Sequence, residues 1–141
     1  MPLNTQNGFN AGFQIANLIN QGESASAQAN RNAQIDYQNA ALGLEEARIR
    51  AAMIMKQGVS AASASKASSA SSGFVSSEGT DLTIQLETLK IANLNAMEEK
   101  RVARVNELRL NESAALSIQR GKVARRSSIL NAASTGINLL S

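Results

Sequence analysis

The chain has 141 residues, with 14 Lys and Arg against 11 Asp and Glu, a net charge of +3, and neither Cys nor His. Without Cys there are no disulfide bridges or thiolate metal sites, and without His the commonest general base and metal ligand at neutral pH is missing. The acids form no recognisable catalytic group, so we expect neither an enzyme nor a cofactor-binding protein.

Small and amide side chains dominate the composition. Ala, Ser, Asn and Gln supply nearly half of the residues, whereas Leu, Ile, Val and Phe supply less than a quarter. So few bulky side chains cannot fill a thick core. We therefore expect an all-α protein of thin helices that gain burial from neighbouring copies. The N-terminus lacks the features of a secretory signal and no stretch is apolar enough to span a membrane, which predicts a protein that is soluble in the cytoplasm where it is made.

Residues 1–22 carry no charged side chain, and we expect them to form a separate amphipathic helix. One interpretation is that this helix packs on a hairpin of its own or a neighbouring chain. The other is that it inserts into a membrane with an amide stripe facing a pore, although about 20 Å of helix is too short to span a bilayer unaided. The apolar residues of this membrane or assembly helix are Phe9, Phe13, Ile15, Leu18 and Ile19, and the amide stripe is Asn10, Gln14, Asn17 and Gln21.

A long αα-hairpin is expected over residues 23–127. Its first helix runs from Ser24 to about Ser72, rich in Ala, Gln, Glu and Arg, which are good or tolerable helix formers. Apolar residues recur along it at spacings of seven, seven and four: Ile35, Leu42, Ile49 and Met53.

The middle of the chain permits two interpretations. Residues 59–72 are almost all Ser or Ala, which by composition alone is typical of a flexible linker. However, a glycine stop, an apolar anchor and turn-forming residues follow in the order expected between two helices. We therefore predict a hairpin turn at about 73–81. Its residues are Gly73, Phe74, Ser76, Ser77 and Gly79.

The second helix is expected to begin near Asp81 or Leu82, with Thr80 or Asp81 as its N-cap, and to end at about Ser127. Its apolar residues lie on two nearly opposite faces, which is typical of a helix with two sets of neighbours, its partner in the chain and another subunit. One face holds Leu82, Leu86, Leu89, Ala96 and Met97, and the other holds Ile84, Ile91, Leu94, Val102 and Val105.

Residues 128–141 form an apolar C-terminal segment that follows a basic stretch. No acid follows Glu112. Cations followed by apolar residues suit an anionic surface, either lipid headgroups or DNA phosphates contacted without sequence specificity. The alternative is a solvated helix end whose cations complement the helix dipole. The cations are Arg120, Lys122, Arg125 and Arg126.

Three stretches resemble the internal virion, or ejection, proteins of T7-like short-tailed bacteriophages. They are "YQNAALGLEEARIRAAMIMKQG" (37–58), "ASSGFVSSEGTDL" (70–82) and "TLKIANLNAMEEKRVARVNEL" (88–108). The family pattern is two alanine- and charge-rich helices around a Ser-Gly-apolar loop, matched here by Ser72, Gly73 and Phe74. Its tyrosine-asparagine-alanine triplet has a counterpart in residues 94–96, where Leu replaces the tyrosine.

The resemblance implies a protein held inside the capsid, in or near a core above the portal. It would be released through the tail at infection and would help form a conduit for the genome across the host cell envelope, at the outer membrane in the small members of the family. The implied partners are copies of the chain as a homo-oligomeric ring, other ejection, portal or tail proteins, the host membrane and phage DNA bound non-specifically.

Two other functions stay open on the sequence. The chain could be a structural core or scaffold subunit that stays in the virion near the portal, its ends serving assembly alone. It could also be a helical adaptor or secreted effector that shares only composition with the phage family. Neighbouring portal or tail genes would distinguish the phage functions from the third.

Overall fold

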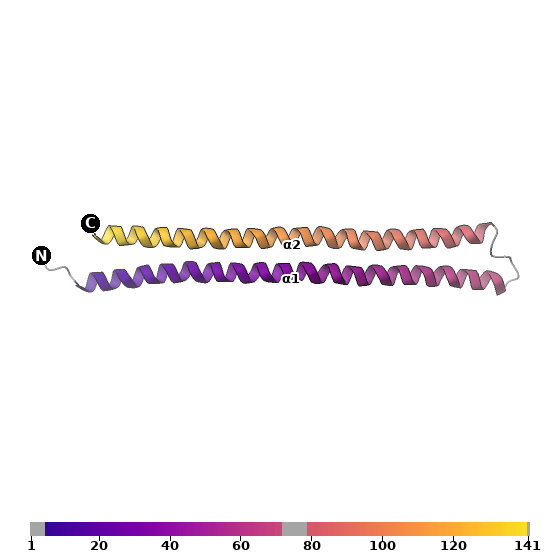
Figure 1. The fold of residues 1–141 in the computed structure, drawn as a ribbon, viewed down its shortest axis with the longest axis horizontal. Helices are drawn as coiled ribbons and strands as arrows, with labels where there is room; N and C mark the ends of the chain where they lie inside the picture. The colour runs from indigo at the N-terminus through magenta and orange to yellow at the C-terminus, as the bar shows by residue number, and fades with distance from the viewer. Residues whose placement is uncertain (1–4, 72–78, 141) are drawn as a thin grey trace. The chain divides into compact units, whose positions relative to one another are not determined.

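The computed structural model describes residues 5–71 and 79–140, which form two long helices (Figure 1). Helix α1 spans Thr5–Ser71, 67 residues, and helix α2 spans Thr80–Leu140, 61 residues. The two helices pack against each other in opposite directions. This confirms the all-α helical hairpin that the sequence predicts.

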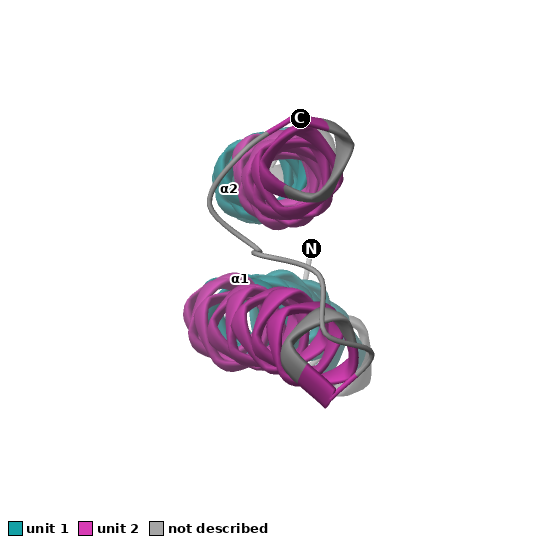
Figure 2. Cartoon of the chain, turned by 90° about the vertical axis from the view of Figure 1, so that its right-hand side faces the viewer, with its two compact units in different colours: residues 1–39, 109–141 teal, residues 40–108 magenta. Residues whose placement is uncertain are grey.

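Contacts divide the chain into two units, coloured separately in Figure 2. Unit 1 combines Met1–Asn39 with Arg109–Ser141, and unit 2 is Ala40–Leu108. Each unit contains a part of both helices. In unit 1 Gly121 of α2 lies against Ala29 of α1, and in unit 2 Gly58 of α1 lies against Ala92 of α2.

Helix α1 runs without a break through residues 5–22, so these residues are its first turns and not a helix of their own. Likewise α2 continues past Ser127 to Leu140. The physical reason is that no proline interrupts either helix, and Gly22, at the expected boundary, is buried beside Ser128 of α2. A glycine that lets two helices touch does not end the helix that carries it.

Gly79 precedes α2 with a positive φ of 87°, a conformation that glycine adopts without steric cost. Its carbonyl accepts hydrogen bonds from the backbone amide of Thr83 at 3.4 Å and from the Thr83 hydroxyl at 3.3 Å. Gly79 therefore holds the start of α2, one residue before Thr80 and two before Asp81, the two expected caps. The other expected turn residues, Gly73, Phe74, Ser76 and Ser77, lie outside the described part of the chain.

The contact between the helices is built from the smallest side chains. Every apolar residue that is buried within the described residues is an alanine. Gly22, Gly58 and Gly121 are buried in the same contact. Small side chains let two helix backbones approach closely. The buried alanines are Ala33, Ala40, Ala47, Ala51, Ala62, Ala92, Ala96, Ala103, Ala114 and Ala132.

Six of these ten buried alanines recur every 11 residues, Ala40, Ala51 and Ala62 on α1 and Ala92, Ala103 and Ala114 on α2. Eleven residues are close to three helical turns, so residues at this spacing stay on one face. The 11-residue period, rather than the spacing of the large apolar residues, defines the face that each helix turns to its partner.

Most of the large apolar residues are exposed and lie outside this contact, contrary to expectation. The stripe of Ile35, Leu42, Ile49 and Met53 on α1 is about half exposed or more. Neither of the two apolar faces expected on α2 is the face that packs against α1. On the face that begins with Leu82, only Ala96 is buried and Leu89 is half-buried. The face that begins with Ile84 is wholly exposed. Alanines occupy the contact, and larger side chains would hold the helices apart.

Candidate functional site

The most distinctive feature of the surface is an ordered set of exposed apolar side chains on α2. Leu94, Val105 and Leu116 are 11 residues apart and 55%, 47% and 45% exposed. Within unit 2, Leu94 and Val105 therefore form one column along the helix, and Leu116 follows at the same spacing in unit 1. A second column, also with 11-residue spacing, consists of Leu86, Met97 and Leu108, and a third of Ile91 and Val102, all of them exposed.

Charged residues follow the first column on both sides with the same period. Lys90 and Arg101 stand four residues before Leu94 and Val105, which places them on one flank of the column. Glu87 and Glu98 fall on the other flank by the same geometry. Between Glu87 and Arg101, one flank of the first column is therefore acidic and the other is basic.

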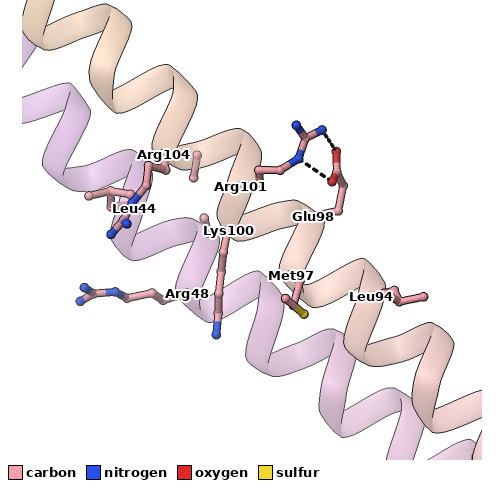
Figure 3. A pocket seen from close by; sticks show the side chains of 10 residues that line it. Leu44, Arg48, Leu94, Met97, Glu98, Lys100, Arg101 and Arg104 are labelled. Atoms are coloured by element: carbon pink, nitrogen blue, oxygen red, sulfur yellow. Dashed lines mark hydrogen bonds and ion pairs between the residues drawn. The ribbon is translucent and has the colours of Figure 1, made fainter.

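One of these charged pairs is joined within its own helix. The Arg101 guanidinium donates two hydrogen bonds to the Glu98 carboxylate, at 2.7 and 2.8 Å (Figure 3). These hydrogen bonds lower the pKa of Glu98 and raise the pKa of Arg101. Both side chains are more than half exposed, so solvent screens the pair.

A groove of about 820 Å³ lies between the helices in unit 2, with Leu44, Ala47, Met97 and Ala103 in its lining. Arg48 of α1 and Lys100 of α2 extend on the same side of it, away from the Glu98–Arg101 pair (Figure 3). Arg104 also lines the groove. Exposed cations of this kind attract anions only weakly, and Arg48 already contacts Glu45 at 3.5 Å.

The N-terminal candidates divide into two groups. Ile15 lies close to Gly136, and the backbone carbonyl of Leu18 accepts a hydrogen bond from the Ser128 hydroxyl, so both residues take part in packing against α2. Phe13 is 71% exposed and Ile19 is 36% exposed. The side chain of Phe9 lies outside the described part of the chain. All residues of the amide stripe are exposed: Asn10, Gln14, Asn17 and Gln21.

The four C-terminal cations are exposed but do not form one patch. Lys122, Arg125 and Arg126 share a helical face, whereas Arg120 is about 200° from Lys122. Arg125 contacts Glu23 of α1 at 3.7 Å, which gives it a role within the chain. Gly121, between Arg120 and Lys122, is buried against α1. A Cβ added there would lie only 2.7 Å from the Cβ of Ala29.

Within residues 5–71 and 79–140, no helix combines the length and apolar character that crossing a membrane requires. The same residues contain no cluster of three or more acidic side chains placed to hold a metal ion. No family model, curated protein or solved structure matches the chain. The functional argument therefore depends on the exposed faces themselves.

The sequence interpretation missed the 11-residue period, which was the signal that would have located both the buried face and the exposed columns. Aligned at this spacing, residues 86–96, 97–107 and 108–118 begin with Leu, Met and Leu and carry alanine at their seventh positions. The large apolar side chains drew attention to heptad-like spacings instead.

Proposed function

We propose that the chain is a phage ejection (internal virion) protein, released from the capsid at infection and forming part of a channel for genome delivery across the host cell envelope. The observation that carries the proposal is that the hairpin buries alanine while most of its large apolar side chains stay exposed. A protein built this way is suited to burying those side chains against copies of itself, as a ring of hairpins requires.

Two further features support a protein that passes through a phage tail. The chain has no disulfide, because it has no Cys. Its buried side chains are small, so the apolar burial opposing its unfolding is modest. In the proposed function it unfolds for passage, refolds in the envelope and associates with other ejection, portal or tail proteins.

The proposed membrane contact is the exposed part of the chargeless N-terminal segment, and Phe13 is its most exposed large apolar side chain. We expect purified protein to release dye from liposomes and Phe13→Asp to abolish release, because a carboxylate resists transfer into a bilayer. Gln28→Asp is the control, since Gln28 is exposed on α1 beyond the chargeless segment. Equal leakage from both variants would show that the N-terminal segment does not insert.

A structural subunit that stays in the virion near the portal is the second candidate. The contacts between the N-terminal and C-terminal segments within unit 1 favour this candidate. Ile15 packs near Gly136, and Arg125 contacts Glu23. The amount of the protein in particles before and after DNA release decides between the two. Loss on release supports ejection, and full retention supports the structural subunit.

A further inference from the structure

We propose that one copy of the chain docks the outward face of its α1, centred on Leu42 and Ile49, into the groove between α1 and α2 of a second copy. Both surfaces lie within unit 2. The inference rests on the self-assembly that the proposed function requires, and it names the two surfaces that meet. The evidence is the apolar lining of the groove, the charges along it and the matching pattern on α1.

The groove has an apolar floor that another helix can cover. Its volume is about 820 Å³, and its lining includes Leu44 and Ala47 of α1 and Met97 of α2. Met97 is 59% exposed. Grooves with an apolar floor bind amphipathic helices, which place side chains three, four or seven positions apart into them. The occupant is therefore expected to be a helix with one narrow apolar face.

The rims of the groove are cationic. Arg48 belongs to the α1 rim, and Lys100 and Arg104 stand four residues apart on the α2 rim (Figure 3). Glu98 is the single acid among the lining residues, and Arg101 already holds it with two hydrogen bonds. Within the described residues, no acid pairs with Lys100 or Arg104. The occupant should therefore carry acids along both edges of its apolar face.

The other side of the hairpin differs from the groove. There the Arg50 guanidinium lies 3.1 Å from the Glu99 carboxylate of α2. Arg48 and Arg50 are about 200° apart around α1, so they lie on different sides of the helix contact. Among the described residues of unit 2, the ion pair that joins the two helices is thus on the side away from the groove, and the groove cations are left to an acid from another molecule.

The outward face of α1 carries the complementary pattern. Leu42 and Ile49 are seven residues apart, 63% and 49% exposed, and on the side of α1 opposite the buried alanines. Glu45 and Glu46 lie between them in the sequence and fall on opposite flanks of this face. Both carboxylates are more than half exposed. An apolar face with an acid on each edge fits an apolar groove with cations on each rim.

The contacts that these acids make within α1 do not prevent docking. Glu45 lies 3.5 Å from Arg48, and Glu46 lies 3.5 Å from Arg50. Exposed ion pairs of this kind contribute little free energy, so their exchange for contacts with another copy costs little. Burial of the apolar side chains then provides most of the affinity, and the charges favour this pair of surfaces over others.

The heights of the two surfaces along the hairpin suit a ring. Leu44 and Arg48 line the groove, and Leu42 and Ile49 lie at the same height on α1. Two copies that run in the same direction therefore dock without sliding along each other. Acids on both flanks fit a partner that runs either way, and the same direction is the one that a ring requires. Because the two surfaces differ, the contact is heterologous, and such contacts generate a ring when their rotation closes.

Cysteine variants test the two surfaces directly, because the chain has no cysteine of its own. Ile49→Cys and Met97→Cys, each alone, should not be cross-linked by a short bismaleimide, since neither residue faces its own copy. A mixture of the two should give cross-linked dimers. In the control mixture Asn95→Cys replaces Met97→Cys and should not link, because Asn95 is exposed one turn before Glu99, on the side away from the groove.

Three outcomes of this experiment contradict the proposal. Cross-linking of either variant alone would indicate that like surfaces meet. A mixture of Ile49→Cys and Met97→Cys that does not link would mean that the outward face of α1 does not enter the groove. Equal linking through Asn95→Cys would mean that the two sides of the hairpin are not distinguished.

Charge variants test the match between rims and flanks. Lys100→Glu with Arg104→Glu makes the α2 rim acidic, and Glu45→Lys with Glu46→Lys makes the flanks of the α1 face basic. Each double variant alone should associate roughly tenfold more weakly than the wild type, measured by sedimentation equilibrium. Mixing the two should restore association, because each then meets its complement. Unchanged association of the first double variant, or no recovery in the mixture, would overturn the proposal, and circular dichroism establishes that each variant is still helical.

Liposome leakage, measured on the wild-type protein, keeps this inference separate from the proposed function. Cross-links that form only in the mixture of Ile49→Cys and Met97→Cys, without leakage by the wild type, would uphold the contact and contradict the channel. Leakage without those cross-links would uphold the channel and contradict the contact.

Discussion

At the scale of single residues, the glycines show most clearly what the helix contact demands. Gly58 lies so close to Ala92 that an added Cβ would overlap the alanine side chain. Around Gly43, in the same helix and the same unit, an added Cβ would meet nothing within 4 Å. One residue type therefore has a structural role at one position and none at the other.

The same substitution at these two positions should have opposite effects. Gly43→Ala should stabilise the protein by about 0.5–1 kcal/mol, because alanine is the better helix former and nothing obstructs its side chain. Gly58→Ala should destabilise it by about 1–3 kcal/mol, because the helices must move apart. Thermal unfolding followed by circular dichroism measures both. An increase in midpoint for both variants would show that the helices are not in close contact at Gly58.

The Glu98–Arg101 pair gives a second prediction at this scale. Hydrogen bonds from Arg101 lower the pKa of Glu98 below its ordinary value of 4.5. A carboxylate with a lowered pKa contributes stability above its unfolded-state pKa, and this contribution is lost as the pH falls through the folded-state value. NMR titration should show the Glu98 pKa rising toward its ordinary value in Arg101→Ala. An unchanged pKa in that variant would contradict the pairing.

At the scale of the helices, the sequence allowed the hairpin to be predicted but not the faces of the two helices. Helix formers without an internal proline predict long helices, and the glycines and serines near residue 79 predict the reversal between them. The buried faces were missed because large apolar side chains normally mark a core. Here Ala51 is 1% exposed while Met53, two residues away, is 58% exposed.

The terminal segments were also expected to be separate helices. The absence of charged side chains in residues 1–22 indicates that this segment has different surroundings from the charged part of α1. Different surroundings do not by themselves end a helix. Ile15 packs beside Gly136 and Gly22 beside Ser128, so α1 continues through this region in contact with α2. Local composition cannot reveal this, because the contact joins residues more than one hundred positions apart in the chain.

The assignment of the buried face predicts different outcomes for two neighbouring alanines. Ala51→Leu should destabilise the protein by about 1–3 kcal/mol or more, because leucine does not fit between closely packed helices. Ala52→Leu should change stability by less than about 0.5 kcal/mol, because Ala52 is exposed. Urea unfolding followed by circular dichroism distinguishes them. Equal effects would mean that the face centred on Ala51 is not the buried one.

At the scale of the whole molecule, stability and assembly are expected to be coupled. The buried side chains are alanines, and an alanine buries little apolar area. Most of the large apolar side chains gain burial only when another molecule covers them. Association should therefore contribute a large share of the stability, and the apparent stability should depend on the protein concentration.

This coupling predicts a thermal unfolding midpoint that rises with protein concentration. For a pair of chains, a hundredfold increase in concentration should raise the midpoint by roughly 5 °C, because unfolding also separates the two copies. Leu94→Asp with Val105→Asp should reduce this dependence, since carboxylates on this exposed apolar face of α2 oppose its burial against another copy. Scanning calorimetry over that range gives the midpoints, and sedimentation equilibrium gives the state of association. A wild-type midpoint that does not move with concentration, in a sample that sediments as a monomer, would mean that the exposed columns are not covered by copies of the chain.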